Sequence, residues 1–155
     1  MAGILKSVSG KANGKVKRKS FVIVVADWNE EITEALFEGA YNGLIDLGAD
    51  KKNITRVNVP GTFELTLGAL KSAERKNVDA VICLGCVIQG ETPHFDYICQ
   101  AVAYGITEVN LKTGKPVIFG VLTVLNKKQA MDRAGGKYGN KGEEAAITAV
   151  RMLEI

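Results

Sequence analysis

The sequence predicts an α/β fold, namely a three-layer α/β/α sandwich built around a four-stranded parallel sheet. Four short apolar runs alternate with segments in which apolar residues recur at helical spacing, and this alternation is typical of parallel strands joined by crossover helices. The runs are 21–26, 54–59, 79–84 and 117–122. A chain of 155 residues with 46% hydrophobic composition can bury one full core, so we expect a single compact domain.

Three connecting segments have the pattern of amphipathic helices. The first is expected to begin after Asn29, with glutamates in its first turn, and to end at Gly48. The third is expected to run over 93–114. The expected core-facing residues are Ile32, Leu36, Ala40, Leu44 and Leu47 in the first helix, Phe63, Leu67 and Leu70 in the second, and Tyr97, Ile98, Ala101, Val102, Gly105 and Val109 in the third.

The C-terminal region is glycine-rich and basic. After the fourth run we expect a short helix over 126–133, a loop over 135–142 and a terminal helix from about 143. This region holds three cations, which are Arg133, Lys137 and Lys141. A basic loop is often only solvated, but the guanidinium of arginine suits bidentate recognition of phosphate.

The first 20 residues form a basic arm. They contain six lysine or arginine residues and no acidic residue, so the net charge of +3 leaves −3 for the rest of the chain. The arm has no aromatic residue for base stacking, which argues against a nucleic-acid partner. We expect it either to stay solvated or to add a strand to a neighbouring subunit. The predicted division is an arm over 1–20 and a folded domain over 21–155.

The sequence favours a cytoplasmic protein without a membrane partner. No apolar run approaches the roughly 20 residues that cross a bilayer, and the N-terminus lacks the apolar segment of a secretory signal. The three cysteines, an odd number, argue for reduced thiols. Cys83 and Cys86 would point to opposite faces of a strand, which favours buried structural thiols over a metal site.

The segment CLGCVIQGETPHFDY, over 83–97, holds the only histidine of the chain, His94. The run 81–88 reads as a strand covered on both faces, and Thr92 with Pro93 is expected to open a helix as N-cap and first-turn residue. A helix N-terminus presents free N–H groups to an anion, and an imidazole beside it can move protons near neutral pH. A structural hydrogen-bonding role for His94 is the alternative.

Polar and aromatic residues converge where the predicted strands end. Ligands bind beyond the C-terminal strand ends of such sheets, and Trp28, the segments 62–64 and 91–94, and Thr123 fall near these ends. The ring of Trp28, the only tryptophan, is suited either to lie over a flat heterocycle or to close the core. Phe63 has the same two alternatives.

Four segments together resemble the 6,7-dimethyl-8-ribityllumazine synthase family in order and spacing. They are VPGTFEL over 59–65, CVIQGETPHFDY over 86–97, FGVLT over 119–123 and DRAGGKYGNKGEEAA over 132–146. The resemblance covers about residue 20 to the C-terminus and implies flavodoxin-like strand order. Three positions depart from the family's usual residues: Trp28 stands where phenylalanine is common, Thr66 where proline is usual, and Gln89 where lysine or arginine is frequent.

The resemblance implies a role for each matching residue. It makes His94 the proton-relaying catalytic residue, and Lys141 an auxiliary one. It assigns the pyrimidine and ribityl chain to Trp28, Thr62, Phe63, Glu64, Cys86, Val87, Ile88 and Phe119, and the phosphate to Glu91, Thr92 and Arg133. We expect the backbone N–H of Glu91, rather than its carboxylate, to face the phosphate, and Phe119 to come from a neighbouring subunit.

The implied reaction joins 5-amino-6-(D-ribitylamino)uracil to L-3,4-dihydroxybutan-2-one 4-phosphate in the penultimate step of riboflavin biosynthesis, with no cofactor and no metal. The implied assembly is a homo-pentamer, closed into an icosahedral 60-mer because the loop over 135–142 has the short, uninserted form. Riboflavin synthase is a candidate partner. The alternatives are a non-catalytic flavin-binding protein, which would need neither His94 nor Arg133, and a purely cage-forming homologue.

Overall fold

The computed structural model of the chain describes residues 16–155. Four parallel strands form one sheet in the order β2-β1-β3-β4. Their bounds are β1 Phe21–Ala26, β2 Ile54–Val59, β3 Ala80–Ile88 and β4 Val117–Val124. The predicted α/β fold with a four-stranded parallel sheet is therefore confirmed, and the strand order is that of flavodoxin-like sheets without their fifth strand.

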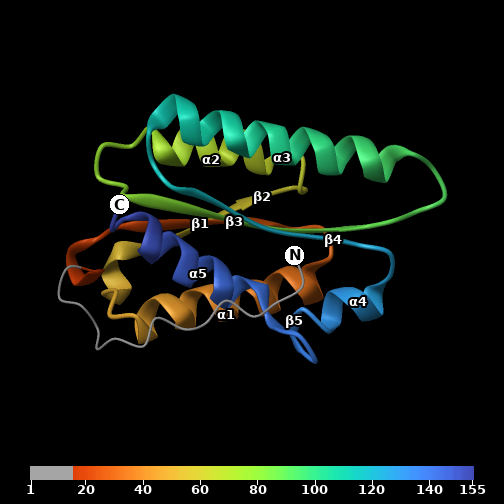
Figure 1. Cartoon of the computed structure of the whole chain (residues 1–155), viewed down its shortest axis with the longest axis horizontal. Coiled ribbons are helices and arrows are strands. Elements are labelled where there is room, and N and C mark those ends of the chain that lie inside the picture. The colour runs from red at the N-terminus through yellow and green to blue at the C-terminus, as the bar shows by residue number, and fades with distance from the viewer. Residues whose placement is uncertain (1–15) are drawn as a thin grey trace.

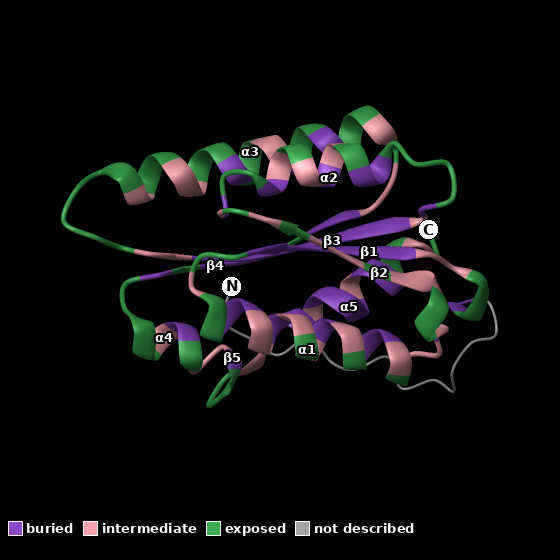
Figure 2. Cartoon of the chain, turned by 180° about the vertical axis from the view of Figure 1, so that it is seen from behind, coloured by how far each residue is buried: buried purple, intermediate pink, exposed green. Residues whose placement is uncertain are grey.

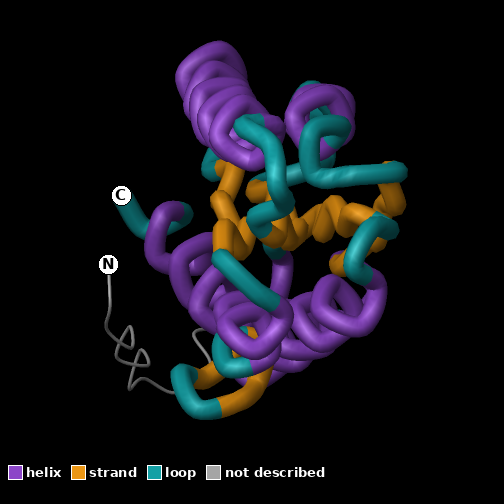
Figure 3. The backbone as a smooth tube through the Cα atoms, turned by 90° about the vertical axis from the view of Figure 1, so that its right-hand side faces the viewer, coloured by secondary structure: helices purple, strands orange, loops and turns teal. Residues whose placement is uncertain are grey.

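Helices cover both faces of this sheet (Figure 1). One layer holds α1 (Glu30–Asp46), α4 (Lys127–Met131) and α5 (Lys141–Met152), and the other holds α2 (Leu65–Ala73) and α3 (His94–Thr113). The carboxyl ends of the strands point to the right in Figure 1, and Figure 3 looks onto this end, with the sheet between the two helical layers.

The strand residues alternate between the two layers. Phe21, Ile23 and Val25 pack toward α1 and α5, whereas Val22, Val24 and Ala26 pack toward α2 and α3, and all six are buried. The buried strands form the centre of Figure 2. Cys83 lies in the α2–α3 core and Cys86 in the α1–α5 core, so the prediction that these thiols point to opposite faces is confirmed.

The third and fourth strands extend beyond the runs 79–84 and 117–122. Their ladder continues in register from Val81↔Val117 to Ile88↔Val124. The bound at Leu84 was too short, whereas the predicted run 81–88 was correct to its end, and β4 continues two residues beyond Leu122. The extension carries the end of β3 past Cys86, toward the segment with His94.

The predicted core-facing stripe of the second helix was correct at Leu70, which packs partly buried against the core, and wrong at its other two positions. Phe63 and Leu67 are 55% and 57% exposed, and Leu65 and Ala69 are buried instead. The reason is the close approach of α2 to the sheet at Gly68, where an added Cβ would lie 2.9 Å from methyl groups of both Val24 and Val59. The helix therefore places Leu65, Ala69 and Ala73 against the sheet and leaves Leu67 exposed.

The third helix also differs from the prediction at its start. Its bounds, His94–Thr113 with Gly114 at the C-cap, are close to those expected, but Tyr97 is 71% exposed. The first turns of α3 extend past α2 in Figure 1, so less structure lies beside them. Pro93 rather than Thr92 occupies the N-cap position, and no side chain caps the helix there.

The glycine-rich segment over 135–142 is not a simple loop. It contains a small antiparallel hairpin of β5 (Ala134–Gly136) and β6 (Gly139–Asn140), after which α5 begins at Lys141. Asn140 caps α5, because its Oδ1 accepts from the backbone N–H of Gly142 at 2.8 Å. Its Nδ2 donates to the carbonyl oxygen of Ala35 in α1 at 2.9 Å, which fixes the hairpin on the α1 layer.

The predicted basic arm falls mostly outside the described residues. Its last part packs on the domain, since Val16 is buried and the Nζ of Lys19 lies 3.1 Å from Oδ1 of Asp79. Within residues 16–155, the structure contains no helix with the length and apolar character needed to cross a bilayer.

Candidate active site

The turn after β1 presents Trp28 to solvent. The backbone N–H of Trp28 donates to the carbonyl oxygen of Pro60 at 3.2 Å, and that of Asp27 donates to the carbonyl oxygen of Val59 at 2.8 Å. These bonds extend the β1–β2 pairing beyond the strands. The indole is 74% exposed, so it does not close the core, and its ring is free to lie over a flat ligand.

Asn29, which the sequence marks only as the boundary of a helix, also holds the turn in place. Its φ of 61° lies in the left-handed region, which asparagine tolerates better than most residues. Its Nδ2 donates to the carbonyl oxygen of Cys86 at 2.9 Å. The turn that carries Trp28 is thereby tied to the end of β3.

The segment before α2 joins the same cluster. Thr62 is buried, and its Oγ1 donates to the carbonyl oxygen of Cys86 at 3.5 Å. A Cβ added to Gly61 would lie 2.9 Å from Oε2 of Glu64 and 3.8 Å from Cδ1 of Trp28, so the carboxylate and the indole meet around this glycine. The 55% exposure of Phe63 excludes a core role for its ring within the single chain.

The end of β3 offers backbone groups to the site, whereas its cysteine thiols are unreactive near neutral pH. Burial raises the pKa of the Cys86 thiol to about 11 and that of Cys83 to about 12, so both stay protonated near neutral pH. Val87 and Ile88 are half-buried, and the backbone N–H of Gln89 donates to the carbonyl oxygen of Val124 at 2.9 Å. This bond completes the strand pairing before the chain leaves the sheet.

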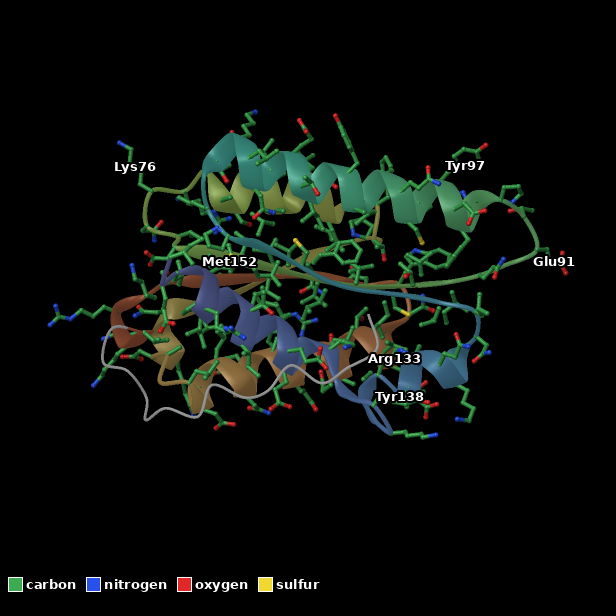
Figure 4. The ribbon with its side chains drawn as sticks, in the orientation of Figure 1. Lys76, Glu91, Tyr97, Arg133, Tyr138 and Met152 are labelled. Atoms are coloured by element: carbon green, nitrogen blue, oxygen red, sulfur yellow. The ribbon has the colours of Figure 1, made fainter. Side chains whose placement is uncertain are left out.

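His94 begins α3 and is exposed. The preceding residues 89–93 form an extended loop, and Glu91 lies at its outer edge and points away from the domain (Figure 4). Among residues 16–155, no hydrogen bond or ion pair involves the imidazole. No contact among the described residues therefore supports a structural role for His94 within the single chain. Thr92 and His94 are both exposed and accessible to a ligand.

Arg133 lies away from the loop that carries Glu91 and Thr92. Its Nη1 donates to the carbonyl oxygen of Gln129 at 3.0 Å, and its guanidinium carbon lies 4.9 Å from the ring centroid of Tyr138. In Figure 4 Arg133 and Tyr138 lie beside α4 and the hairpin, in the layer opposite α3. The three predicted phosphate ligands are therefore not gathered by one chain.

Lys141 belongs to the Arg133 side of the domain. Its backbone N–H donates to the carbonyl oxygen of Arg133 at 2.9 Å, and its Nζ lies 2.7 Å from Oε2 of Glu144. The second carboxylate oxygen of Glu144 is buried and has no hydrogen-bond partner among the described residues. The cation of Lys141 is consequently held close to the helix start.

Phe119 is also distant from Trp28 within one chain. It pairs in register with Cys83, which pairs with Val24, so two strand spacings and the length of four residues separate Phe119 from Trp28. At about 4.8 Å per spacing and about 3.3 Å per residue, the separation of the two backbone positions is roughly 16 Å. Phe119 is 42% exposed, and its ring and that of Trp28 are not neighbours within one chain.

The arrangement gives the domain two separate half-sites. The first half-site comprises Trp28, Asn29, Thr62, Phe63, Glu64 and the end of β3, and offers an aromatic face and hydrogen-bonding groups. His94, at the start of α3, has no hydrogen bond to this cluster among the described residues. The second half-site comprises Arg133 and Lys141 beside α4 and α5, and offers two cations. Phe119, in register with Cys83 on the α2–α3 side of the sheet, is a further exposed aromatic ring outside the first half-site. Among residues 16–155, no group of three or more His, Cys, Asp or Glu side chains is arranged to hold a metal ion.

Comparison with known proteins gives consistent matches. The family model described as 6,7-dimethyl-8-ribityllumazine synthase matches residues 18–155. A protein of that name from Cytophaga hutchinsonii is 67% identical over 149 residues, covering 96% of this chain and 93% of its own. Those from Parabacteroides distasonis and Flavobacterium johnsoniae are 58% and 55% identical, covering 86% and 87% of this chain and 83% and 71% of their own. The family match includes every residue of both half-sites.

Proposed function

The chain belongs to the 6,7-dimethyl-8-ribityllumazine synthase family, and on that premise we propose that it condenses 5-amino-6-(D-ribitylamino)uracil with L-3,4-dihydroxybutan-2-one 4-phosphate. The products are 6,7-dimethyl-8-ribityllumazine, inorganic phosphate and water. The observation that carries the proposal is the 67% identity to a lumazine synthase over 96% of the chain. The two half-sites supply the groups that this chemistry needs.

The first half-site holds the pyrimidine and its ribityl chain. The exposed indole of Trp28 stacks on the heterocycle, while Thr62, Phe63 and Glu64 contact its edge and side chain. The end of β3, from the buried Cys86 to the half-buried Val87 and Ile88, completes the binding surface. This arrangement orients the reacting amine, and orientation of two reactants contributes a large share of catalysis in bimolecular condensations.

His94 moves protons between the reacting groups. The reaction requires attack of an amine on a ketone, loss of phosphate, tautomerisation, ring closure by the ribitylamine and dehydration, and each stage transfers a proton. The imidazole of His94 is exposed and forms no hydrogen bond or ion pair with the described residues, so it is suited to transfer these protons. Because positioning supplies much of the acceleration, loss of His94 should slow turnover without abolishing it.

Arg133 binds the phosphate of the four-carbon substrate across a subunit interface. Its guanidinium lies on the α4 side of the domain, whereas Glu91 and Thr92 lie in the loop before α3. A site that uses all three therefore takes Arg133 from one subunit and the loop from its neighbour. We infer the same for Phe119, which is exposed and lies two strands away from the strand that carries Trp28. Lys141 adds positive charge to the half-site of Arg133.

We propose that the protein is a homo-pentamer that closes into an icosahedral 60-mer. A site divided between neighbouring subunits suits a head-to-tail contact, which forms a ring when its rotation closes. The short hairpin over β5 and β6 leaves little bulk between α4 and α5. We further propose that the enzyme works in the cytoplasm, and that riboflavin synthase, which consumes the product, is its functional partner.

The residues argue for an enzyme over the alternatives of a flavin-binding or purely cage-forming protein. Flavin storage on this scaffold would use Trp28 and Phe119 but would need neither His94 nor Arg133, and all four residues are present. The test is to mix the purified protein with both substrates and follow formation of the fluorescent lumazine. Clear acceleration over the uncatalysed condensation supports the enzyme, whereas formation at the background rate would favour a flavin-binding or cage role.

A further inference from the structure

We propose that Tyr138 is a positioning residue for Arg133, and that its ring holds the guanidinium so that the N–H edge stays free for the substrate phosphate. This inference rests on the proposed function, because it takes Arg133 as the phosphate ligand. The family resemblance assigned no role to Tyr138. Its role follows from two contacts to the same ring, from Arg133 and from Lys137.

The first step of the argument is the geometry of the Arg133 side chain. The guanidinium carbon lies 4.9 Å from the ring centroid of Tyr138, within the range of cation–π attraction. On another side, Nη1 donates to the carbonyl oxygen of Gln129 in α4 at 3.0 Å. The side chain is therefore held between the end of α4 and the hairpin.

The second step is that the face and the edge of the guanidinium make different contacts. A cation over an aromatic ring uses the flat face of the guanidinium, whereas phosphate oxygens are bound by N–H groups that point outward in its plane. Among the described residues, only the carbonyl of Gln129 accepts a hydrogen bond from this group. Contact with Tyr138 thus restrains Arg133 without occupying the remaining donors.

The third step is that the hairpin backbone fixes where the ring lies. The backbone N–H of Tyr138 donates to the carbonyl oxygen of Asp132 at 2.7 Å, and that of Lys141 donates to the carbonyl oxygen of Arg133 at 2.9 Å. Gly136 packs so closely that an added Cβ would lie 2.7 Å from the carbonyl oxygen of Met131. The ring and Arg133 are consequently set on one compact unit.

Lys137 strengthens the same arrangement. Its Nζ lies 5.2 Å from the ring centroid of Tyr138, so one ring gathers two cations that would otherwise repel each other. The result is a local positive field at the half-site that receives a doubly charged phosphate. Because the ring is 46% exposed, the attraction is that of a partly solvated pair.

The test compares Tyr138→Leu with Tyr138→Phe. Leucine keeps an apolar side chain but removes the ring. We expect it to raise the KM for the four-carbon phosphate about two- to fivefold, the factor that an exposed cation–π contact supplies. The KM for the pyrimidine substrate and kcat should change less. Inhibition by inorganic phosphate should weaken by the same factor as the KM. Phenylalanine, which keeps the ring face, should restore the wild-type KM.

The variant Arg133→Ala distinguishes failure of the phosphate assignment of Arg133 from failure of the positioning role of Tyr138. If Arg133→Ala leaves the KM for the phosphate substrate unchanged, the assignment of Arg133 to phosphate is wrong, and the role of Tyr138 falls with it. If Arg133→Ala raises this KM while Tyr138→Leu behaves as wild type, only the positioning role is wrong. If Tyr138→Leu and Tyr138→Phe both lower kcat and raise both KM values to the same extent, Tyr138 only stabilises the hairpin. That result would also overturn the positioning role.

Discussion

The side chain of Asn29 donates a hydrogen bond to the carbonyl oxygen of Cys86 at 2.9 Å, joining the turn after β1 to the end of β3 although 57 residues separate them. Thr62 approaches the same carbonyl from the segment before α2. One backbone oxygen therefore organises the ends of two neighbouring strands and the turn that carries Trp28. The first half-site depends on this shared acceptor.

Replacement of Asn29 should destabilise the domain and disturb the position of Trp28. Asn29→Ala removes the bond to Cys86 and places an alanine at a φ of 61°, and we expect a loss of about 1–3 kcal/mol in the free energy of unfolding. Asn29→Gly is the matched control, because glycine accepts this backbone conformation and loses only the bond. Urea unfolding at fixed protein concentration measures both, and an Asn29→Ala variant as stable as wild type would refute the role of this turn.

Loss of the imidazole should slow catalysis while substrate binding persists. We expect His94→Ala to reduce kcat by about 10²-fold, at the low end of what general acid–base groups contribute, with smaller changes in both KM values. His94→Gln, which keeps hydrogen-bonding capacity without titrating near neutral pH, should be similarly slow. Steady-state kinetics of lumazine formation distinguishes the outcomes. Wild-type activity in either variant would remove His94 from the mechanism.

The exposed indole should bind a flavin-like ring. Because Trp28 is the only tryptophan and its side chain is 74% exposed, titration with riboflavin should quench the tryptophan fluorescence in a saturable manner. Trp28→Phe should bind riboflavin more weakly, since phenylalanine has a smaller stacking face, and equilibrium dialysis measures that change. Absence of quenching at saturating riboflavin would contradict stacking at this turn.

The buried thiols make stability fall at high pH. Burial raises the pKa of Cys83 from 9.0 to about 12 and that of Cys86 from 9.0 to about 11, so on a pH increase the unfolded chain loses these protons first. Their contribution is therefore fully present below pH 9 and is lost as the pH rises toward the folded values. The urea midpoint should decline above pH 9, and less steeply in Cys83→Ala. An identical slope in that variant would contradict the assignment.

The same burial sets the order in which the thiols react. Cys99 is half-buried, whereas Cys83 and Cys86 are buried in the two cores. Iodoacetamide at pH 8 should therefore modify Cys99 first in the native protein and the other two only after unfolding. Peptide mapping by mass spectrometry measures the order in which the three cysteines are modified. Modification of Cys83 before Cys99 would contradict the prediction and would show that the α2–α3 core opens readily.

The fold was predictable because its strongest signals are local. The run 21–26 is apolar at every position, and it forms a strand buried on both faces. The orientation of α2 was not predictable, since its apolar residues surround the helix and the choice between Leu65 and Leu67 depends on the approach of Gly68 to the sheet. The hairpin over β5 and β6 was missed because glycines signal turns more clearly than they signal strand pairing.

The candidate site was predictable in one half only. The cluster of Trp28, Thr62 and Glu64 follows from the rule that parallel strands end at one edge of the sheet. The placement of Arg133 depends on how α4 folds back under the sheet, which no residue pattern along the chain specifies. Asn29 had a local signal, because asparagine after a strand often adopts a left-handed conformation. Tyr138 had none, since its significance comes only from its contacts.

The central claim is that each catalytic centre is completed by a neighbouring subunit, and mixed assemblies test it most directly. His94→Ala and Arg133→Ala subunits, each poorly active alone, would be co-expressed in equal amounts and assayed for lumazine formation. If the two residues act across an interface, each site takes His94 from one subunit and Arg133 from its neighbour. In a random equal mixture about one such site in four carries both wild-type residues, so activity should recover to roughly a quarter of wild type. If both residues act within one chain, every centre remains defective, and the mixture would show no recovery above the two separate variants.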